Sequence, residues 1–325
     1  MRDTRKNTIV RIGRVWAVSV VLASLTLGLT GIASADPRRD QGPQARKDFI
    51  RVTNNISLLV EEYDRAKVEL KQTREQLVEL RATLQATQKE ARTARARLAA
   101  RVAEVYRGNG SQLEVLLGSS SVSDFGDRAA FLSGMVGDDA DLITTARVKS
   151  EIARRAQHDV AAAVKREEEL MKLIKERTTA IRATLPYQRQ LDRLAGNDSS
   201  GLEAAAPSGS GRGAAVVRAA MSKVGAPYVW AAAGPNAFDC SGFTMWAWSQ
   251  VGVSLPHSSS MQYSVLPKVS MSALQPGDLI FSYSPIHHVG IYIGGGKFIH
   301  SPHSGDVVKI TAVAGYPVVG AARPG

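Results

Sequence analysis

Cysteine is nearly absent from this chain of 325 residues, which contains only Cys240. A single cysteine cannot form a disulfide within the chain, so disulfides do not hold the fold together. The sequence also predicts export, as described below, and a free thiol in an oxidising compartment is a liability unless its reactivity is used. Cys240 is therefore the first candidate for a nucleophile. The alternative is that it is a small buried apolar residue.

Aromatic residues are also scarce, at 6% of a chain that is 44% hydrophobic, and three of the four tryptophans lie beyond residue 229. This distribution predicts two domains, of which only the C-terminal one has a sizeable globular core. The net charge is +11, but about +4 belongs to the first fourteen residues, where five basic side chains outweigh Asp3. No nucleic-acid-binding motif is present, and the moderate positive charge of the rest suits an acidic polymer such as a cell wall.

Residues 1–35 have the pattern of an export signal. A basic start is followed by an uncharged stretch at 15–32 and by Ala33-Ser34-Ala35, a small-residue cleavage site. We expect a mature protein that begins at Asp36 and is secreted and associated with the cell wall. The alternative is an uncleaved anchor, because about 18 apolar residues can just span a bilayer.

Proline is missing from residues 45–106, which follow a heptad pattern typical of a long coiled-coil helix. A second helix with a weaker, alanine-rich seam is predicted at 140–194, and the two should fold back as an antiparallel hairpin. The apolar segment at 113–132 between them either binds a partner or packs as a small helical cap. Residues 196–212 are rich in Gly and Ser and predict a flexible linker to a domain at 213–325. The heptad positions are Ile56, Leu59, Tyr63, Ala66, Leu70, Thr73, Leu77, Leu80, Leu84, Thr87, Ala91, Ala94, Leu98 and Val105.

Five of the six histidines follow Cys240. Cys240 precedes a short predicted helix at 243–250, and a helix start favours the reactive thiolate. Residues 288–293 and 297–301 predict a β-hairpin in which His288 and His300 leave the same face, so they can touch. This indicates a Cys-His-His relay. A metal site is a rival interpretation, but the segment offers no carboxylate or second thiol at ligand spacing.

The remaining histidines of this region are less informative. His287 and His303 are expected to be solvated loop residues. His257 lies among three hydroxyl side chains, and it either lines a groove or caps a turn. The domain as a whole is expected to be α+β, with helices on one side of a small antiparallel sheet.

Five motifs in matching order make the C-terminal third similar to the NlpC-type family of papain-like peptidoglycan endopeptidases. They are YVW at 228–230, FDCSG at 238–242, LPHSS at 255–259, PGDL at 276–279 and HVGIYIG at 288–294. The resemblance implies that Cys240 is the nucleophile, His288 the general base and His300 the orienting residue. It also implies a substrate-binding set, which consists of Tyr228, Asp239, Ser241, His257 and Ser258. One departure is Ala231-Ala-Ala233, where the family usually has glycines.

Family members cut amide bonds in peptidoglycan stem peptides, most often between D-γ-glutamate and the following diamino acid, without a metal or an organic cofactor. The resemblance therefore implies a cysteine endopeptidase of the cell wall. Two alternatives stay open: a wall-binding scaffold without activity, and an amidase or acyltransferase on the same Cys-His framework.

The coiled coil is expected to restrain or position this domain, because a short tether holds the two at an effective concentration on the order of millimolar. Similar modules dock onto membrane-embedded division complexes, which would make residues 113–117 a partner contact. The rival interpretation is a passive spacer or an oligomerisation stalk.

Overall fold

The computed structural model describes residues 41–107, 122–196, 201–205 and 210–325. The predicted export signal at 1–35 and the predicted partner contact at 113–117 lie outside these ranges. Within them, no helix is both long and apolar enough to cross a membrane.

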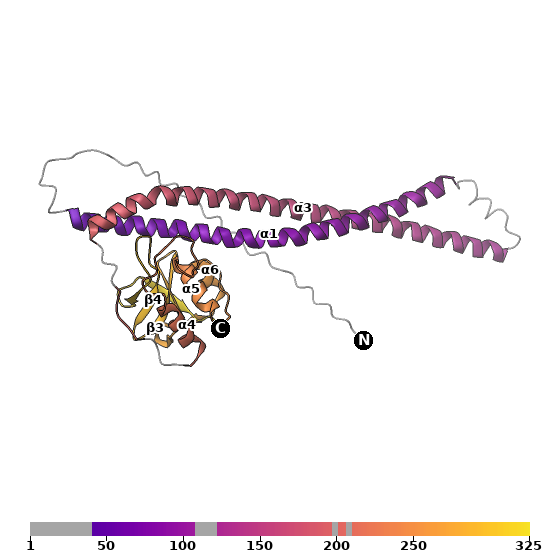
Figure 1. Cartoon of the computed structure of the whole chain (residues 1–325). Helices are drawn as coiled ribbons and strands as arrows, with labels where there is room; N and C mark the ends of the chain where they lie inside the picture. Colours follow the sequence, from indigo (N-terminus) through magenta and orange to yellow (C-terminus); the bar gives the residue numbers. More distant parts are fainter. Residues whose placement is uncertain (1–40, 108–121, 197–200, 206–209) are drawn as a thin grey trace. The chain divides into compact units, whose positions relative to one another are not determined.

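Two long helices, α1 (Gln41–Arg107) and α3 (Val122–Ala195), form the first part of the fold. They run side by side (Figure 1). Cross-helix ion pairs join Glu69 to Arg166 and Glu90 to Lys149. The residue numbers therefore rise along α1 while those of the partners fall along α3. The two helices are antiparallel, which confirms the predicted hairpin.

The seam of the hairpin is built from the predicted heptad. Leu70 and Leu77 of α1 are buried, as are Leu170 and Ile181 of α3. One expectation is wrong: the second helix begins at Val122 and not near residue 140. Gly126, Gly134 and Gly137 favour an irregular segment, since glycine lowers helix propensity by about 1 kcal/mol relative to alanine. The surrounding helix overrides this local preference.

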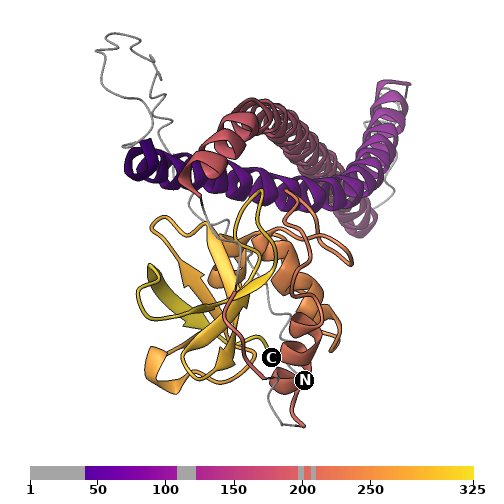
Figure 2. The ribbon, with the colours of Figure 1, turned by 60° about the vertical axis from the view of Figure 1, so that its left-hand side comes forward.

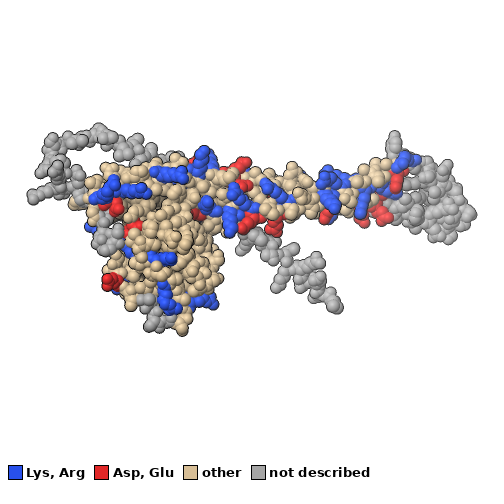
Figure 3. Space-filling model, viewed as in Figure 1, with Lys and Arg blue, Asp and Glu red and all other residues tan. Residues whose placement is uncertain are grey.

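Charged side chains of both signs line the hairpin (Figure 3). The pairs that cross between the helices also include Arg74 with Glu167 at 2.7 Å. These groups are solvent-exposed, so each pair contributes at most about 1 kcal/mol, and their main effect is to favour one register.

The C-terminal part is an α+β domain, as predicted. A six-stranded antiparallel sheet has the order β1-β6-β2-β3-β4-β5, and the helices pack beside it (Figure 2). The helices are α4 (Arg212–Met221), α5 (Cys240–Ser249), α6 (Ser259–Val265) and the short 3-10 helix η1 (Met271–Ala273). The strands are β1 (Lys268–Val269), β2 (Leu279–Ser282), β3 (His288–Gly294), β4 (Lys297–His300), β5 (Lys309–Ala312) and β6 (Val318–Ala322).

The core of this domain lies between the helices and β3. Phe238, Phe243, Phe281 and Ile291 are fully buried in one apolar cluster. Burying such a side chain stabilises the fold by about 1.5–3 kcal/mol, so this core holds α5, and with it Cys240, firmly against the sheet.

Gly290 allows β3 and β4 to approach each other closely. A Cβ atom at Gly290 would lie 2.6 Å from the ring of Phe298 and 2.9 Å from the Cβ of His300, which is closer than atoms can approach without displacement. The absence of a side chain at this position therefore lets His300 pack against β3.

Part of the predicted linker is hydrogen-bonded to the C-terminal domain. The Leu202 N–H donates to the carbonyl oxygen of Ile310 in β5 at 2.9 Å. The hairpin and the domain belong to one compact unit, Asp40–Gly325.

Candidate active site

Cys240 is the first residue of α5, and the residue before it caps that helix. Asp239 has an extended backbone, and its Oδ1 accepts a hydrogen bond from the Gly242 N–H at 2.7 Å. An N-cap side chain of this kind satisfies an otherwise unpaired N–H of the first turn. The cap fixes where the helix starts, and so it fixes the direction of the Cys240 side chain.

His288 and His300 lie in contact, as the hairpin spacing predicts. Their ring atoms Nε2 and Nδ1 are 2.8 Å apart. The strand register pairs Ile291 with Ile299, which makes the two histidines diagonal neighbours on one face. His300 Nε2 lies 2.9 Å from Thr311 Oγ1. When His300 donates to Thr311, its Nδ1 accepts the N–H of His288, and His288 Nδ1 is then left with the lone pair of a base.

Both histidines are neutral in the folded protein. Burial, and after it the neighbouring His287 and His303, lower the pKa of His288 to about 3. Burial also lowers the pKa of His300 well below its usual value, and His288 adds to this. A neutral imidazole is the form that can accept a thiol proton.

Cys240 itself differs from the sequence-based expectation of a thiolate. Burial raises its pKa well above the usual value, and the negative charges of Asp239, Glu61 and Asp64 raise it further. A hydrogen bond from the Ser241 N–H lowers the pKa, but the other causes outweigh it. The helix start therefore does not activate the thiol in this arrangement.

The Cys240 side chain is also not engaged with the predicted base. Its Sγ makes a weak contact with the carbonyl oxygen of His287 at 4.0 Å, and within the described part of the chain no hydrogen bond joins it to His288. The nucleophile is present beside a preformed histidine pair but is held as a shielded thiol.

The residues predicted to bind substrate surround this centre. His257 Nε2 lies 3.0 and 2.8 Å from the two carboxylate oxygens of Asp239. The Ser241 hydroxyl donates to Asp239 Oδ1 at 3.3 Å. Tyr228 is buried, and its pKa is raised by burial and then by Cys240 and Asp239, which shows that it lies near them. Ser258 caps α6 by accepting from the Met261 N–H.

His287 and His303 are not solvated loop residues. His287 is buried, its Nδ1–H donates to the Pro285 carbonyl oxygen at 2.7 Å, and its ring stacks on Tyr283. His303 meets the ring of Phe49 of α1 edge-on, with centroids 5.2 Å apart. The expectation failed for His287 because its own loop folds over the ring, and for His303 because a helix distant in sequence packs against it.

The backbone next to Trp230 is unusual. Ala231 has a φ of 59°, in the left-handed region that favours glycine. This is the position where the sequence departs from the family pattern, and the alanine adopts the glycine-like conformation at some cost in strain.

Glu61 of α1 binds directly beside this centre, which the sequence analysis did not foresee. Its carboxylate accepts hydrogen bonds from the hydroxyls of Ser258, Ser259 and Ser260 at 2.5, 2.5 and 2.6 Å. It also accepts from the backbone N–H groups of Ser259 and Ser260 at 2.9 and 3.0 Å. We call these five donors the serine cradle. The contact positions α1 against the start of α6.

Two further contacts hold α1 on the domain. Tyr63 meets the ring of Trp230 edge-on, with centroids 4.8 Å apart, and Trp230 packs against the apolar cluster of the hairpin. No heptad pattern could reveal this second interface, because it depends on a surface formed by another domain.

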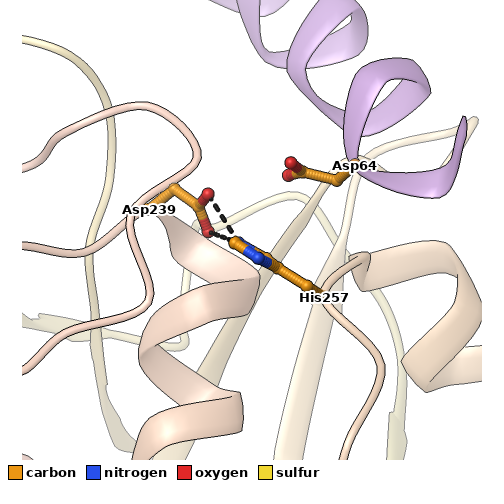
Figure 4. A group of neighbouring side chains, drawn as sticks. All are labelled: Asp64, Asp239 and His257. Carbon is orange, nitrogen blue, oxygen red and sulfur yellow. Dashed lines mark hydrogen bonds and ion pairs between the residues drawn. The ribbon is translucent and has the colours of Figure 1, made fainter. Parts of the chain in front are cut away.

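Asp64 of α1 points toward Asp239 and His257 (Figure 4). One ligand atom from each of these three side chains lies within 4.8 Å of the other two. Burial raises the pKa of Asp64 well above its usual value, and the charges of Asp239 and Glu61 raise it further, against the lowering effect of Lys67. These three residues are the ones in the described chain that could hold a metal ion.

Comparisons with known proteins give matches to both parts of the chain. Residues 225–318 match the model of the NlpC/P60 family, and residues 84–153 match the coiled-coil domain of the peptidoglycan hydrolase PcsB. A probable endopeptidase of Corynebacterium glutamicum is 50% identical over 107 residues, which are 33% of this chain and 51% of that protein. A probable endopeptidase of Mycobacterium tuberculosis is 48% identical over 111 residues, which are 34% of this chain and 29% of that protein.

Among solved structures, the NlpC/p60 domain of the peptidoglycan hydrolase SagA is 41% identical, covering 34% of this chain and 97% of that one, with a TM-score of 0.33. The chain spans about a third to a half of the length of the two endopeptidases.

Proposed function

We propose that this protein is a cysteine endopeptidase that cuts peptidoglycan stem peptides and is restrained by its own hairpin, because residues 225–318 match the NlpC/P60 family. The observation that carries the proposal is the Cys240, His288 and His300 arrangement, in which the histidine pair is 2.8 Å apart and neutral. A buried nucleophile, a base and an orienting residue are the parts that acyl transfer by a thiol requires.

The reaction begins when neutral His288 takes the proton of Cys240. The thiolate attacks the carbonyl carbon of the scissile amide, and backbone N–H groups at the start of α5 stabilise the oxyanion. His288 then gives its proton to the departing amine, which leaves a thioester on Cys240. Water, deprotonated by His288, hydrolyses the thioester and restores the thiol. His300, held by Thr311, keeps the His288 ring in the orientation that both proton transfers need.

The serine cradle supports a substrate with a free carboxylate close to the scissile bond. It binds the Glu61 carboxylate through five donors, two of which are backbone N–H groups. D-γ-Glutamate in a stem peptide is linked through its side chain, so its α-carboxylate is free beside the bond that follows. We infer that this carboxylate occupies the cradle in the complex and that Glu61 occupies it in the resting protein. Asp239, Ser241, His257 and Tyr228 then line the rest of the groove.

The same contact supports restraint by the hairpin. α1 occupies the cradle, covers Trp230 through Tyr63, and brings two carboxylates that raise the pKa of Cys240. Docking of α1 therefore blocks substrate and disfavours the thiolate at the same time. Activation requires α1 to leave the domain.

Two parts of the proposal rest on sequence alone. Residues 1–35 are proposed to export the protein to the cell wall, and residues 113–117 are proposed to contact a membrane-embedded partner that draws the hairpin away. Both segments lie outside the described residues.

The test compares two soluble stem peptides that differ at one group. One carries L-alanyl-D-γ-glutamyl-diamino acid with a free α-carboxylate, and the other carries an α-carboxamide at the same position. We use the Glu61→Gln chain, in which the cradle is open, and the same chain with Cys240→Ala as the control. Mass spectrometry of the products should show cleavage after D-γ-glutamate by the first protein only.

The carboxamide should raise KM at least tenfold, because its N–H₂ group replaces one of the two oxygens that share the five donors and therefore faces donors itself. Equal KM values for the two peptides would exclude the cradle as the carboxylate site. Cleavage by the Cys240→Ala control would exclude the cysteine mechanism, release at another bond would show an amidase, and no cleavage at all would favour a scaffold.

A further inference from the structure

The hairpin and the catalytic domain meet at a buried group of charged side chains, in which the carboxylate of Asp64 has no described positive partner. Asp64 of α1 is 2% exposed, and no hydrogen bond or ion pair joins its carboxylate to a residue in the described ranges. An isolated buried carboxylate costs several kcal/mol, so Asp64 must either hold a proton or meet a positive species at this point.

The neighbours of Asp64 do not supply it. Glu61 and Asp239 are both negative. Their oxygens already accept hydrogen bonds, from the serine cradle and from the start of α5. The His257 imidazole is directed at Asp239, at 2.8 Å. Lys67 is the positive side chain that acts on Asp64, but it does so through space and forms no ion pair with it among the described residues.

We propose that Asp64, Asp239 and His257 bind a divalent cation, with Zn²⁺ as the best fit, and that this ion fastens α1 to the catalytic domain. The three side chains offer two carboxylates and one imidazole, with one ligand atom of each within 4.8 Å of the others. Zn²⁺ takes nitrogen and oxygen ligands at about 2.0–2.2 Å, which places two ligand atoms of a tetrahedral site about 3.4 Å apart. A side-chain rotation of Asp64 closes the remaining distance.

The direction of the side chains fits this assignment. Asp64 extends from α1 toward the other two residues, which come from the start of α5 and from the loop before α6 (Figure 4). When the ion binds, the Nε2 proton of His257 is released to solvent. The ring nitrogen then bonds to the metal and no longer donates to the Asp239 carboxylate. The Glu61 carboxylate does not serve as the fourth ligand, because it is fully engaged by the serines. The fourth ligand position is therefore open to water.

This site would make the resting state depend on metal. One ligand belongs to the hairpin and two belong to the domain, so the full set exists only when α1 is docked, and the ion stabilises the docked form by mass action. The binding itself is independent of catalysis, whereas its effect on activity rests on the proposed peptidase function.

The test is calorimetric titration of the metal-free full chain with Zn²⁺, in a Cys240→Ala background that removes the thiol as a competing ligand. We expect one ion per chain and a Kd at least tenfold weaker for Asp64→Asn and for His257→Gln. Asp48→Asn, a matched change on α1 outside the group, should leave the Kd unchanged. Because the chain is inert, failure here leaves the peptidase proposal intact.

Two outcomes would overturn the inference. Stoichiometric binding that is equally tight in Asp64→Asn would place the ion elsewhere. Absence of binding at 100-fold excess of Zn²⁺ over the protein at about 10 μM would show that Asp64 is neutralised by a proton instead. The two variants also separate ligand loss from misfolding, since they remove ligands from different elements.

Discussion

Replacing Glu61 with glutamine should convert the resting protein into an active one. The carboxylate accepts five hydrogen bonds at 2.5–3.0 Å from the serine cradle, and it is 7% exposed. A glutamine amide has one carbonyl oxygen that can still accept, but its N–H₂ group faces donors and must turn away. Because the substitution is close in volume, it should leave the hairpin itself intact.

The size of the effect follows from the hydrogen bonds that are lost. A hydrogen bond to a charged group contributes about 1.5–3 kcal/mol, and several bonds to one carboxylate do not add. The open form recovers part of this energy because water then solvates the cradle. A loss of about 2–4 kcal/mol from the docked form is therefore expected, which corresponds to roughly a 30- to 1000-fold rise in the ratio of open to docked chains.

The assay is kcat/KM on a soluble stem peptide, together with the rate of Cys240 alkylation by iodoacetamide. Both should rise with the open fraction until the open form dominates. Glu62→Gln is the matched control, since Glu62 is the next residue along α1 and pairs with Arg177 of α3 and not with the catalytic domain. If Glu61→Gln and Glu62→Gln gave the same rates as the unmodified chain, the restraint by α1 would be refuted.

The remaining predictions concern the catalytic residues and Thr311. In the Glu61→Gln background, Cys240→Ala should abolish cleavage, and His300→Ala should leave a slower enzyme. Thr311→Val should lower kcat about 2- to 13-fold with KM unchanged, which matches the loss of one hydrogen bond of about 0.5–1.5 kcal/mol. A changed KM with constant kcat would argue against an orienting role. Because the pKa of His288 is lowered from 6.5 to about 3 in the fold, its contribution to stability is complete above pH 6.5 and is lost as the pH falls. Between pH 6.5 and 5 it should remove about 2 kcal/mol, measured as a lower urea midpoint, and a midpoint that did not fall would contradict the buried neutral state.

The parts of the site that could be predicted from sequence are those fixed by local spacing. His288 and His300 follow from the period of two in a β-hairpin with a glycine turn, and the buried positions of α1 follow from the heptad. Thr311 could not be found in this way, because it reaches His300 through the pairing of β4 with β5, and nothing in its neighbourhood marks it out. The prediction of a lowered pKa for Cys240 was wrong for a similar reason, since the pKa depends first on burial in the folded protein, then on the charge of Asp239, and then on the charges of Glu61 and Asp64 in α1.

Glu61 and Asp64 show why the interface itself is invisible in the sequence. In a coiled coil, charged residues beside the apolar seam are expected to face water, and that is the normal interpretation of the run from 61 to 65. The two carboxylates are three residues apart, so they leave α1 on nearly the same side, and both are buried by the catalytic domain.

Burying two carboxylates beside Asp239 is unfavourable unless each is matched by its surroundings. Glu61 is matched by five donors, which makes docking specific for one position along α1, because moving the helix by a single residue would place Glu62 or Val60 at the cradle. Asp64 is not matched by any described side chain, so docking at that same position requires either a proton on Asp64 or a further positive species. The resting state therefore has a strong contact and a weak one within a single turn of helix, and the weak one is the point at which a change in the surroundings can release α1.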